Sequence, residues 1–244
     1  MHRLRVATWN IHKGIGTDRR YEIERTLDVL ASMDADVLCL QEVDERVPRS
    51  SLHPQARVMA RELGYDHVAL GLNVAVRGGH YGNCTLSRWP FHHVRNLDLT
   101  IPPKKRRSSL VTRIHGPGGR DWTVANVHLG LLHMERRVQL ARLFEELRRH
   151  APDGVGLVVA GDLNDWGFRL ATTIQRLDGL RVARSEVGPR AGPRTFPSRH
   201  PVAALDKILV RMPVEVTHVG VARDPRTWRA SDHLPLYADL RLPS

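Results

Sequence analysis

The chain has 244 residues, of which 41% are hydrophobic and 5% aromatic, and its formal net charge is +11. This length suits one domain built from two packed sheets, so we expect a single domain over residues 1–244. No apolar run approaches the roughly 18 residues of a membrane-spanning helix, so we expect no transmembrane segment.

The location that we expect is the cytoplasm. A strand pattern begins within a few residues of Met1, which leaves no room for the apolar segment of a signal peptide. The only cysteines are Cys39 and Cys84, which are too few for the disulfide framework of a small secreted protein. We therefore expect two reduced thiols.

The positive charge favours a polyanionic partner, either nucleic acid or an anionic lipid surface. A coding bias toward arginine would produce the same charge without such a partner. The densest basic stretch is KKRR at residues 104–107, and a solvated strand edge that discourages aggregation is its simplest structural explanation. Charge alone therefore does not identify the function.

Strands and helices alternate in the first part of the chain, where apolar residues recur at strand and helix spacing. The expected elements are a strand at 4–11, a helix at 20–33, a strand at 36–43 and a helix at 54–63. Both strands become polar near their ends, the first at Asn10 and the second at Glu42.

The middle of the chain contains short strands whose connections are too short for crossover helices, so they should pair antiparallel. The expected elements are strands at 67–70, 84–87, 94–99, 110–114 and 122–128, followed by a helix at 134–150. The strand at 122–128 has a polar end with Asn126 and His128.

The stretch GLVVAGDLNDWG, residues 156–167, is the most informative part of the sequence. An apolar strand at 157–163 ends in a carboxylate and an amide at alternate positions, Asp162 and Asn164. If this segment is extended, both side chains point to the same side. The alternative is a turn in which Asp165 caps the next helix.

The remaining elements are shorter. We expect a short helix at 167–177, a loop at 188–201, and strands at 204–210 and 234–240. Two strand–helix–strand halves joined by antiparallel strands predict an α/β (α+β) fold, a four-layer α/β/β/α sandwich of two mixed β-sheets.

Six strand ends carry polar residues for which a hydrophobic core has no use. They are Asn10, Glu42, His128, Asp162 with Asn164, Asp206, and Asp232 with His233. Four carboxylates in one cleft would repel one another strongly, and a divalent cation would compensate for them. Because the oxygen ligands are carboxylates and amides, they favour Mg²⁺ or Mn²⁺.

These residues lie in motifs that resemble those of the endonuclease/exonuclease/phosphatase superfamily, which has the DNase I-like fold. The motifs are TWNIH at 8–12, LQEV at 40–43, YGNCTLSRWP at 81–90, NVHLG at 126–130, GDLND at 161–165, LDKILV at 205–210 and SDHLP at 231–235. They occur in the family's order over nearly the whole chain.

The resemblance implies a role for each matching residue. Glu42, Asn10 and Asp232 would bind the metal. His233 would be the general base that activates water, and Asp206 would orient its ring.

It also implies roles for three further residues. Asp162 and Asn164 would hold the water or a second metal and the scissile phosphate. His128 would stabilise the transition state from the phosphate side. His12 and Lys13 we interpret as exposed loop residues outside the site.

Metal-assisted hydrolysis of a phosphoester is shared by several classes within this fold, so the motifs do not select a substrate. Lys105 and Arg107 occupy the place where DNase I-like nucleases contact backbone phosphates, and Arg19, Arg20 and Arg194 lie at the expected rim. We therefore expect a Mg²⁺-dependent phosphodiesterase, a nuclease of low sequence specificity. The alternatives are a hydrolase of a lipid or small-molecule phosphoester and a non-catalytic basic nucleic-acid-binding module.

Overall fold

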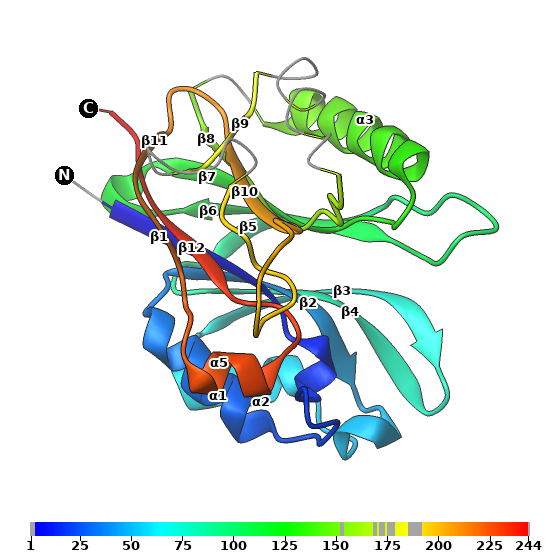
Figure 1. Ribbon diagram of the computed structural model, residues 1–244. Helices are drawn as coiled ribbons and strands as arrows, with labels where there is room; N and C mark the ends of the chain where they lie inside the picture. Colours follow the sequence, from blue (N-terminus) through cyan, green and yellow to red (C-terminus); the bar gives the residue numbers. More distant parts are fainter. Residues whose placement is uncertain are drawn as a thin grey trace.

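The computed structural model describes residues 3–151, 154–167, 170, 174, 179–184 and 192–243. Within these residues the chain forms two six-stranded mixed sheets, which stack face to face in Figure 1. Most of the helix expected at 167–177 and the first part of the loop expected at 188–201 lie outside the described residues.

The first sheet has the strand order β11-β12-β1-β2-β4-β3. Its strands are β1 (Arg3–Asn10), β2 (Val37–Glu45), β3 (His67–Val76), β4 (Gly79–Ser87), β11 (Glu215–Val221) and β12 (Leu236–Arg241). Only β1 and β2 pair in parallel, because α1 (Ile23–Met33) connects them as a crossover.

The second sheet has the strand order β5-β6-β7-β8-β10-β9. Its strands are β5 (Phe91–Asp98), β6 (Ser108–His115), β7 (Asp121–His128), β8 (Gly156–Asp162), β9 (Arg181–Val182) and β10 (Asp206–Val210). Here β7 and β8 form the parallel pair, and α3 (His133–His150) connects them.

Helices cover the outer faces of both sheets. In Figure 1, α3 lies above the second sheet, and α1, α2 (Gln55–Leu63) and α5 (Pro225–Ala230) lie below the first. The apolar residues of α3 expected to face inward, Leu140, Leu143, Phe144 and Leu147, are buried against the sheet. In the described part of the chain, three short 3₁₀ segments occupy loops, at His12–Gly14, Pro48–Ser50 and Pro117–Gly119.

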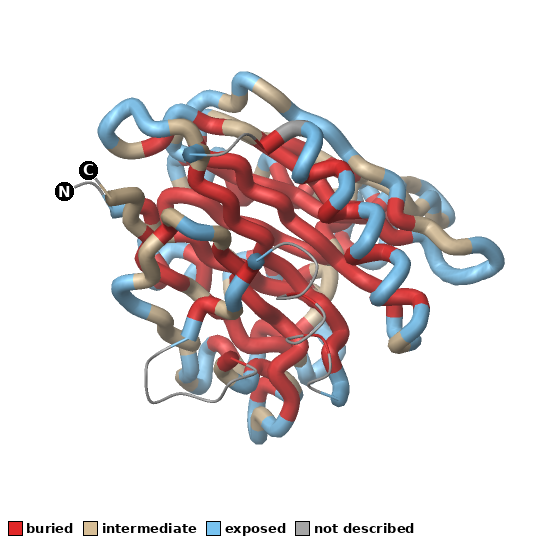
Figure 2. The backbone as a smooth tube through the Cα atoms, turned by 90° about the horizontal axis from the view of Figure 1, so that it is seen from above, coloured by how far each residue is buried: buried red, intermediate tan, exposed pale blue. Residues whose placement is uncertain are grey.

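The core between the sheets consists mainly of small and branched apolar side chains. Val6, Val37 and Cys39 of the first sheet pack with Val158 and Ile208 of the second, and Figure 2 shows buried strands crossing the centre of the molecule. The predicted α/β/β/α sandwich is therefore confirmed. None of the helices in the described ranges is long and apolar enough to cross a bilayer.

Two expectations about elements were incomplete. β3 and β4 are each about twice as long as predicted, since their pairing continues to Val76 and Gly79, and β4 also pairs with β2 as far as His80. β11 and α5 were not predicted at all: β11 has no buried residue, and α5 has six residues. Cys39 and Cys84 are buried free thiols, as expected.

A buried amide pair joins the two sheets. Gln41 of β2 donates from Nε2 to Asn126 Oδ1 of β7 at 2.8 Å. The Asn126 amide donates to the backbone oxygens of Leu40 at 3.1 Å and Cys84 at 2.8 Å, and both amide residues are fully buried. Asn126 is thus a polar bridge between sheets rather than a site residue.

We expect Asn126→Ala to lower the free energy of unfolding by about 3 kcal/mol, because it removes three buried hydrogen bonds, those with Gln41, Leu40 and Cys84. Denaturant unfolding measures this loss. The matched control is Asn96→Ala, an exposed position on β5, which should change stability by less than about 0.5 kcal/mol. Equal effects of the two substitutions would refute the bridging role.

Candidate active site

The strand topology brings the polar residues to one edge of the sandwich. The strand β1 ends at Asn10, β7 ends at His128 and β8 ends at Asp162. Each of these strands belongs to a parallel pair. β10 runs antiparallel to β8, so its first residue, Asp206, pairs directly with Asp162. His233 lies just before β12, which runs antiparallel to β1.

His233 lies between two buried carboxylates. Its Nδ1 is 2.8 Å from Asp206 Oδ2, and its Nε2 is 3.9 Å from Asp162 Oδ2. Asp206 Oδ2 also accepts a hydrogen bond from the hydroxyl of Thr195 at 2.6 Å. The ring is therefore held at Nδ1, and its Nε2 faces Asp162.

The backbone around His233 is fixed as well. The indole N–H of Trp9 donates to the carbonyl oxygen of His233 at 2.9 Å. The His233 N–H donates to Ser231 Oγ at 3.1 Å, and this hydroxyl donates to the carbonyl of Asn10 at 2.7 Å. The loop before β12 is thereby attached to the end of β1.

Burial and the neighbouring carboxylates shift the pKa of His233 in opposite directions. Burial alone would lower the pKa of His233, but the carboxylates of Asp206 and Asp162 outweigh it and raise the pKa above its ordinary value. Burial, together with the Asp206 carboxylate, raises the pKa of Asp162. The imidazolium and the carboxylates therefore stabilise one another's charges.

Asn10 and His128 both contact Asp162. Asn10 Nδ2 donates to Asp162 Oδ2 at 3.1 Å, and His128 Nε2 is 3.5 Å from the same oxygen. Burial lowers the pKa of His128 well below its ordinary value, and the charge of Arg107 acts in the same direction. His128 is thus a neutral ring that offers one N–H.

Glu42 occupies a bulge in β2. The register with β4 shifts between Leu40 and Val43, and Glu42 has φ = 57°. Burial alone would raise the pKa of Glu42, but the surrounding positive charge, including the Lys13 ammonium in contact with Glu42 Oε2, lowers it. Glu42 therefore stays ionised.

Lys13 corrects an expectation from the sequence. We interpreted it as an exposed loop residue, but its side chain is only 16% exposed and forms an ion pair with Glu42. It reaches Glu42 because residues 12–14 form a 3₁₀ turn with Lys13 at φ = 64°, a conformation that the sequence pattern gave no means of predicting.

Asn164 is also placed differently from the extended geometry that we expected. Its φ is 51°, so the chain turns there and its side chain does not continue the face of Asp162. Its Nδ2 donates to the carbonyl of Leu129 at 2.9 Å, and its backbone N–H donates to Asp162 Oδ1 at 2.9 Å. Asn164 thereby orients the Asp162 carboxylate.

The basic stretch after β5 borders this edge. Arg107 is 7% exposed, and its positive charge acts on His128. Lys105 lies over the ring of Tyr81, with Nζ 5.2 Å from the ring centroid, and its charge acts on Glu42. Both residues therefore place positive charge beside the acidic cluster.

The residues fit a hard divalent cation. Glu42 offers an ionised carboxylate, and Asn10 and Asp232 offer further oxygen atoms, the ligand type that Mg²⁺ and Mn²⁺ prefer. In addition, Asp206 Oδ1 is buried without a hydrogen-bond partner among the described residues. The ligand atoms of Asp162, Asp206 and His233 lie within 4.8 Å of one another.

A second group with metal-ligand spacing exists in the described part of the chain. It consists of His92, His115 and Asp121, of which both histidines are exposed. Asp121 begins β7 and His128 ends it, so this group lies at the opposite end of the sheet from the candidate site.

Comparisons with known proteins bear on the family and the fold. Residues 7–233 match the model of the Endonuclease/Exonuclease/phosphatase family. The uncharacterized protein YbhP of Escherichia coli K12 is 35% identical over 249 residues, which covers 98% of this chain and 96% of YbhP.

Two solved structures have the same fold. An endonuclease/exonuclease/phosphatase from Beutenbergia cavernae is 26% identical with a TM-score of 0.77, and the match covers 100% of this chain and 72% of that one. ANGEL2, a 2′,3′-cyclic phosphatase, is 20% identical with a TM-score of 0.75, and the match covers 98% and 96%.

The chain therefore belongs to the Endonuclease/Exonuclease/phosphatase family. It is a phosphoesterase of that family with a buried Asp and His cluster at the site.

We expect Asp206→Asn to lower the pKa of His233, because it removes the charge that faces Nδ1 and leaves burial to favour the neutral ring. Imidazole ¹⁵N NMR in excess EDTA measures the shift. The exposed His218 on β11 is the internal reference, since it lies outside the cluster. An unchanged titration of His233 would contradict the proposed electrostatic contact.

Proposed function

We propose that this protein is a divalent-metal-dependent phosphodiesterase that cleaves nucleic acid with little sequence specificity. The observation that carries the proposal is the position of His233, hydrogen-bonded at Nδ1 to Asp206 and with Nε2 facing Asp162. This arrangement suits a base that takes a proton from an attacking water.

In the proposed reaction, the water oxygen attacks the phosphorus in line with the ester bond that breaks. His233 Nε2 takes the proton of the water, and Asp206 holds the ring and stabilises the imidazolium. His233 becomes a competent base when the negative charge of Asp162 is compensated, because that charge contributes to its raised pKa.

Asp162 would orient the water, and Asn164 would hold Asp162 in place. The neutral ring of His128 suits a hydrogen-bond donor to a phosphate oxygen better than a general acid, because its pKa is depressed by burial. The proton for the departing oxygen would then come from solvent.

Glu42, Asn10 and Asp232 would hold the cation, Mg²⁺ or Mn²⁺. Once bound, it supplies positive charge against the charge that develops on the phosphate oxygens. Lys13 forms an ion pair with Glu42. When the cation is bound, the Lys13 ammonium would stay near the Glu42 carboxylate and would contact a phosphate oxygen of the substrate.

Nucleic acid is the proposed substrate because of the charge around the site. Lys105 and Arg107 lie beside Glu42 and His128, and the whole chain carries +11. Contacts of such residues with phosphates do not depend on base sequence. ANGEL2, which shares the fold, is a 2′,3′-cyclic phosphatase, so ribonucleotide chemistry occurs on this architecture.

We expect supercoiled plasmid and a short labelled duplex to be cleaved with Mg²⁺ and not with EDTA. Asp162→Ala and His233→Ala should each lower kcat by roughly 10²–10⁴-fold, the usual contribution of acid–base residues, while circular dichroism shows a folded protein. His218→Ala, an exposed histidine on β11, is the matched control and should retain full activity.

Other outcomes would favour the alternatives. Release of a headgroup from lysophospholipid, with plasmid left intact, would contradict the nuclease proposal and support a lipid phosphoesterase. Tight binding of nucleic acid with no metal-dependent turnover of any phosphoester would support a binding module instead. Retention of most activity by His233→Ala would refute its role as the base.

A further inference from the structure

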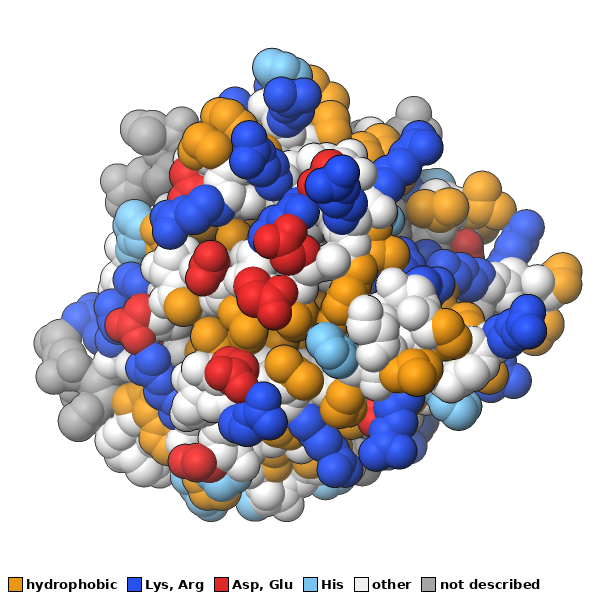
Figure 3. Space-filling model, turned by 90° about the horizontal axis from the view of Figure 1, so that it is seen from below, with side chains coloured by type: hydrophobic (Ala, Val, Ile, Leu, Met, Phe, Trp, Pro, Cys, Tyr) orange, Lys and Arg blue, Asp and Glu red, His pale blue; other side chains and the backbone are white. Residues whose placement is uncertain are grey.

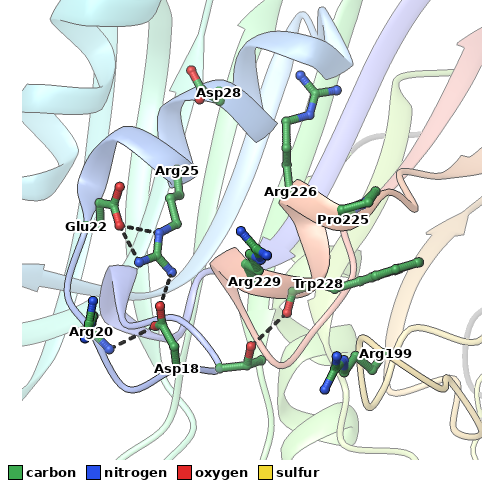
Figure 4. Close-up of a pocket in the computed structure, with 11 residues that line it drawn as sticks. Asp18, Arg20, Glu22, Arg25, Asp28, Arg199, Pro225, Arg226, Trp228 and Arg229 are labelled. Atoms are coloured by element: carbon green, nitrogen blue, oxygen red, sulfur yellow. Dashed lines mark hydrogen bonds and ion pairs between the residues drawn. The ribbon is translucent and has the colours of Figure 1, made fainter.

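A second cavity lies beside the candidate site. It has a volume of about 870 Å³ and is bounded by the loop at residues 17–20, by α1, by Arg199 and by α5. Figure 4 shows the side chains that line it, and Figure 3 shows that acidic and basic side chains intermingle on the face that α1, α2 and α5 form.

Five arginines and three acidic residues, Asp18, Glu22 and Asp28, line the cavity, so its charge is positive. Arg25 forms ion pairs with Asp18 and Glu22 and is thereby neutralised. A further lining arginine, Arg226, forms an ion pair with Asp224. By contrast, no ion pair joins the remaining three lining arginines, Arg20, Arg199 and Arg229, to any described residue.

A further hydrogen-bond donor is also free. The indole Nε1 of Trp228 is buried and has no hydrogen-bond partner in the described part of the chain. Unpaired guanidinium groups and a free N–H around one space are the groups that bind phosphate oxygens, and an anion would relieve the repulsion between the arginines.

Backbone hydrogen bonds connect the walls of this cavity to one another and to Asp232 of the candidate site. Thr17 donates from its N–H to the carbonyl of Arg229 at 3.0 Å and from its hydroxyl to that of Trp228 at 3.1 Å. Ser198, beside Arg199, donates from its N–H to the carbonyl of Asp232 at 2.7 Å.

The short chain segment between the cavity and the candidate site limits the distance between them. Trp228 and Asp232 are four residues apart, a span of at most about 14 Å even when fully extended. A nucleic-acid strand rises ~3.4 Å per phosphate along its axis. The cavity is therefore within reach of a phosphate a few nucleotides from the one that is cleaved.

We propose that this cavity, built around Arg20, Arg199 and Arg229, binds a second phosphate group of the substrate while another is hydrolysed beside His233. The inference rests on the proposed function for the identity of the substrate, but not for the binding of phosphate. It makes Arg199 and Arg229 specificity-determining residues for substrates that carry more than one phosphate.

Gly16 allows the loop at residues 17–20 to pack closely against α5. A Cβ at this position would lie 2.4 Å from the carbonyl oxygen of Arg229 and 2.7 Å from Nη1 of Arg25. Any larger residue would push the loop away from α5, so the close approach that shapes the cavity needs glycine here.

The test measures binding of inorganic pyrophosphate by calorimetry in excess EDTA, so that no metal takes part. Arg229→Gln and Arg199→Gln should each weaken binding by at least about tenfold, since each removes a charge-assisted contact. Gly16→Ala should weaken it without removing a charge. Arg61→Gln, an exposed arginine on α2 outside the cavity, is the matched control and should bind as the wild type does.

Pyrophosphate binding that is unchanged in both arginine variants would overturn the inference. So would binding that is lost only in Lys105→Gln, because the anion would then occupy the catalytic cleft. Absence of binding to the wild type would overturn it as well.

A second measurement separates this inference from the proposed function. It compares kcat/KM for bis(p-nitrophenyl) phosphate, with one phosphate, and for a thymidine oligonucleotide of about six residues, long enough to span the distance. The preference for the oligonucleotide should fall at least about tenfold in Arg229→Gln. If the oligonucleotide is not cleaved while pyrophosphate binding still depends on Arg229, the nuclease proposal fails and the phosphate site remains.

Discussion

The hydrogen bond between Gln41 and Asn126 is the contact on which the geometry of the site depends. It lies in the dry core between two sheets, where an unpaired amide would cost several kcal/mol, so it fixes how the sheets face each other. Gln41 immediately precedes Glu42, and Asn126 lies two residues before His128 on β7. The same contact therefore sets the relation between the bulge that presents Glu42 and the strand end that presents His128. A second contact, from Asn83 Nδ2 of β4 to the carbonyl of Ser108 of β6 at 3.1 Å, supports it nearby.

At the edge that this bridge positions, the fold concentrates negative charge in a poorly solvated space. Asp162 and Asp206 are paired residues of adjacent strands, and both are almost fully buried. A single imidazole between two carboxylates balances only part of that charge. In the same way, the Lys13 ammonium partly balances the negative charge of Glu42. This excess of carboxylate oxygen is costly for folding alone, and it is the reason that a divalent cation suits the site.

Sequence patterns predicted the sandwich because its buried strands are apolar and its parallel pairs are connected by amphipathic helices. They also located the polar strand ends, since a carboxylate that follows a buried strand has no role in the core.

The sequence patterns failed where tertiary contacts decide the local structure. β11 is a half-exposed edge strand, and α5 is a helix of only six residues that begins at a capping box on Asp224. The sequence pattern likewise does not encode the left-handed conformations of Lys13 and Asn164. The roles of the individual site residues and the single domain over residues 1–244 stay predictions.

The central claim is that side chains far apart in the sequence surround one cation at this edge. Crystals grown with Mn²⁺ and measured for anomalous scattering test it most directly. We expect an anomalous peak with oxygen atoms of Glu42 and of Asn10 or Asp232 at about 2.1 Å, next to the Asp162 and His233 pair. A peak only at the exposed group of His92, His115 and Asp121, or an ordered Glu42 with no ion beside it, would contradict the account.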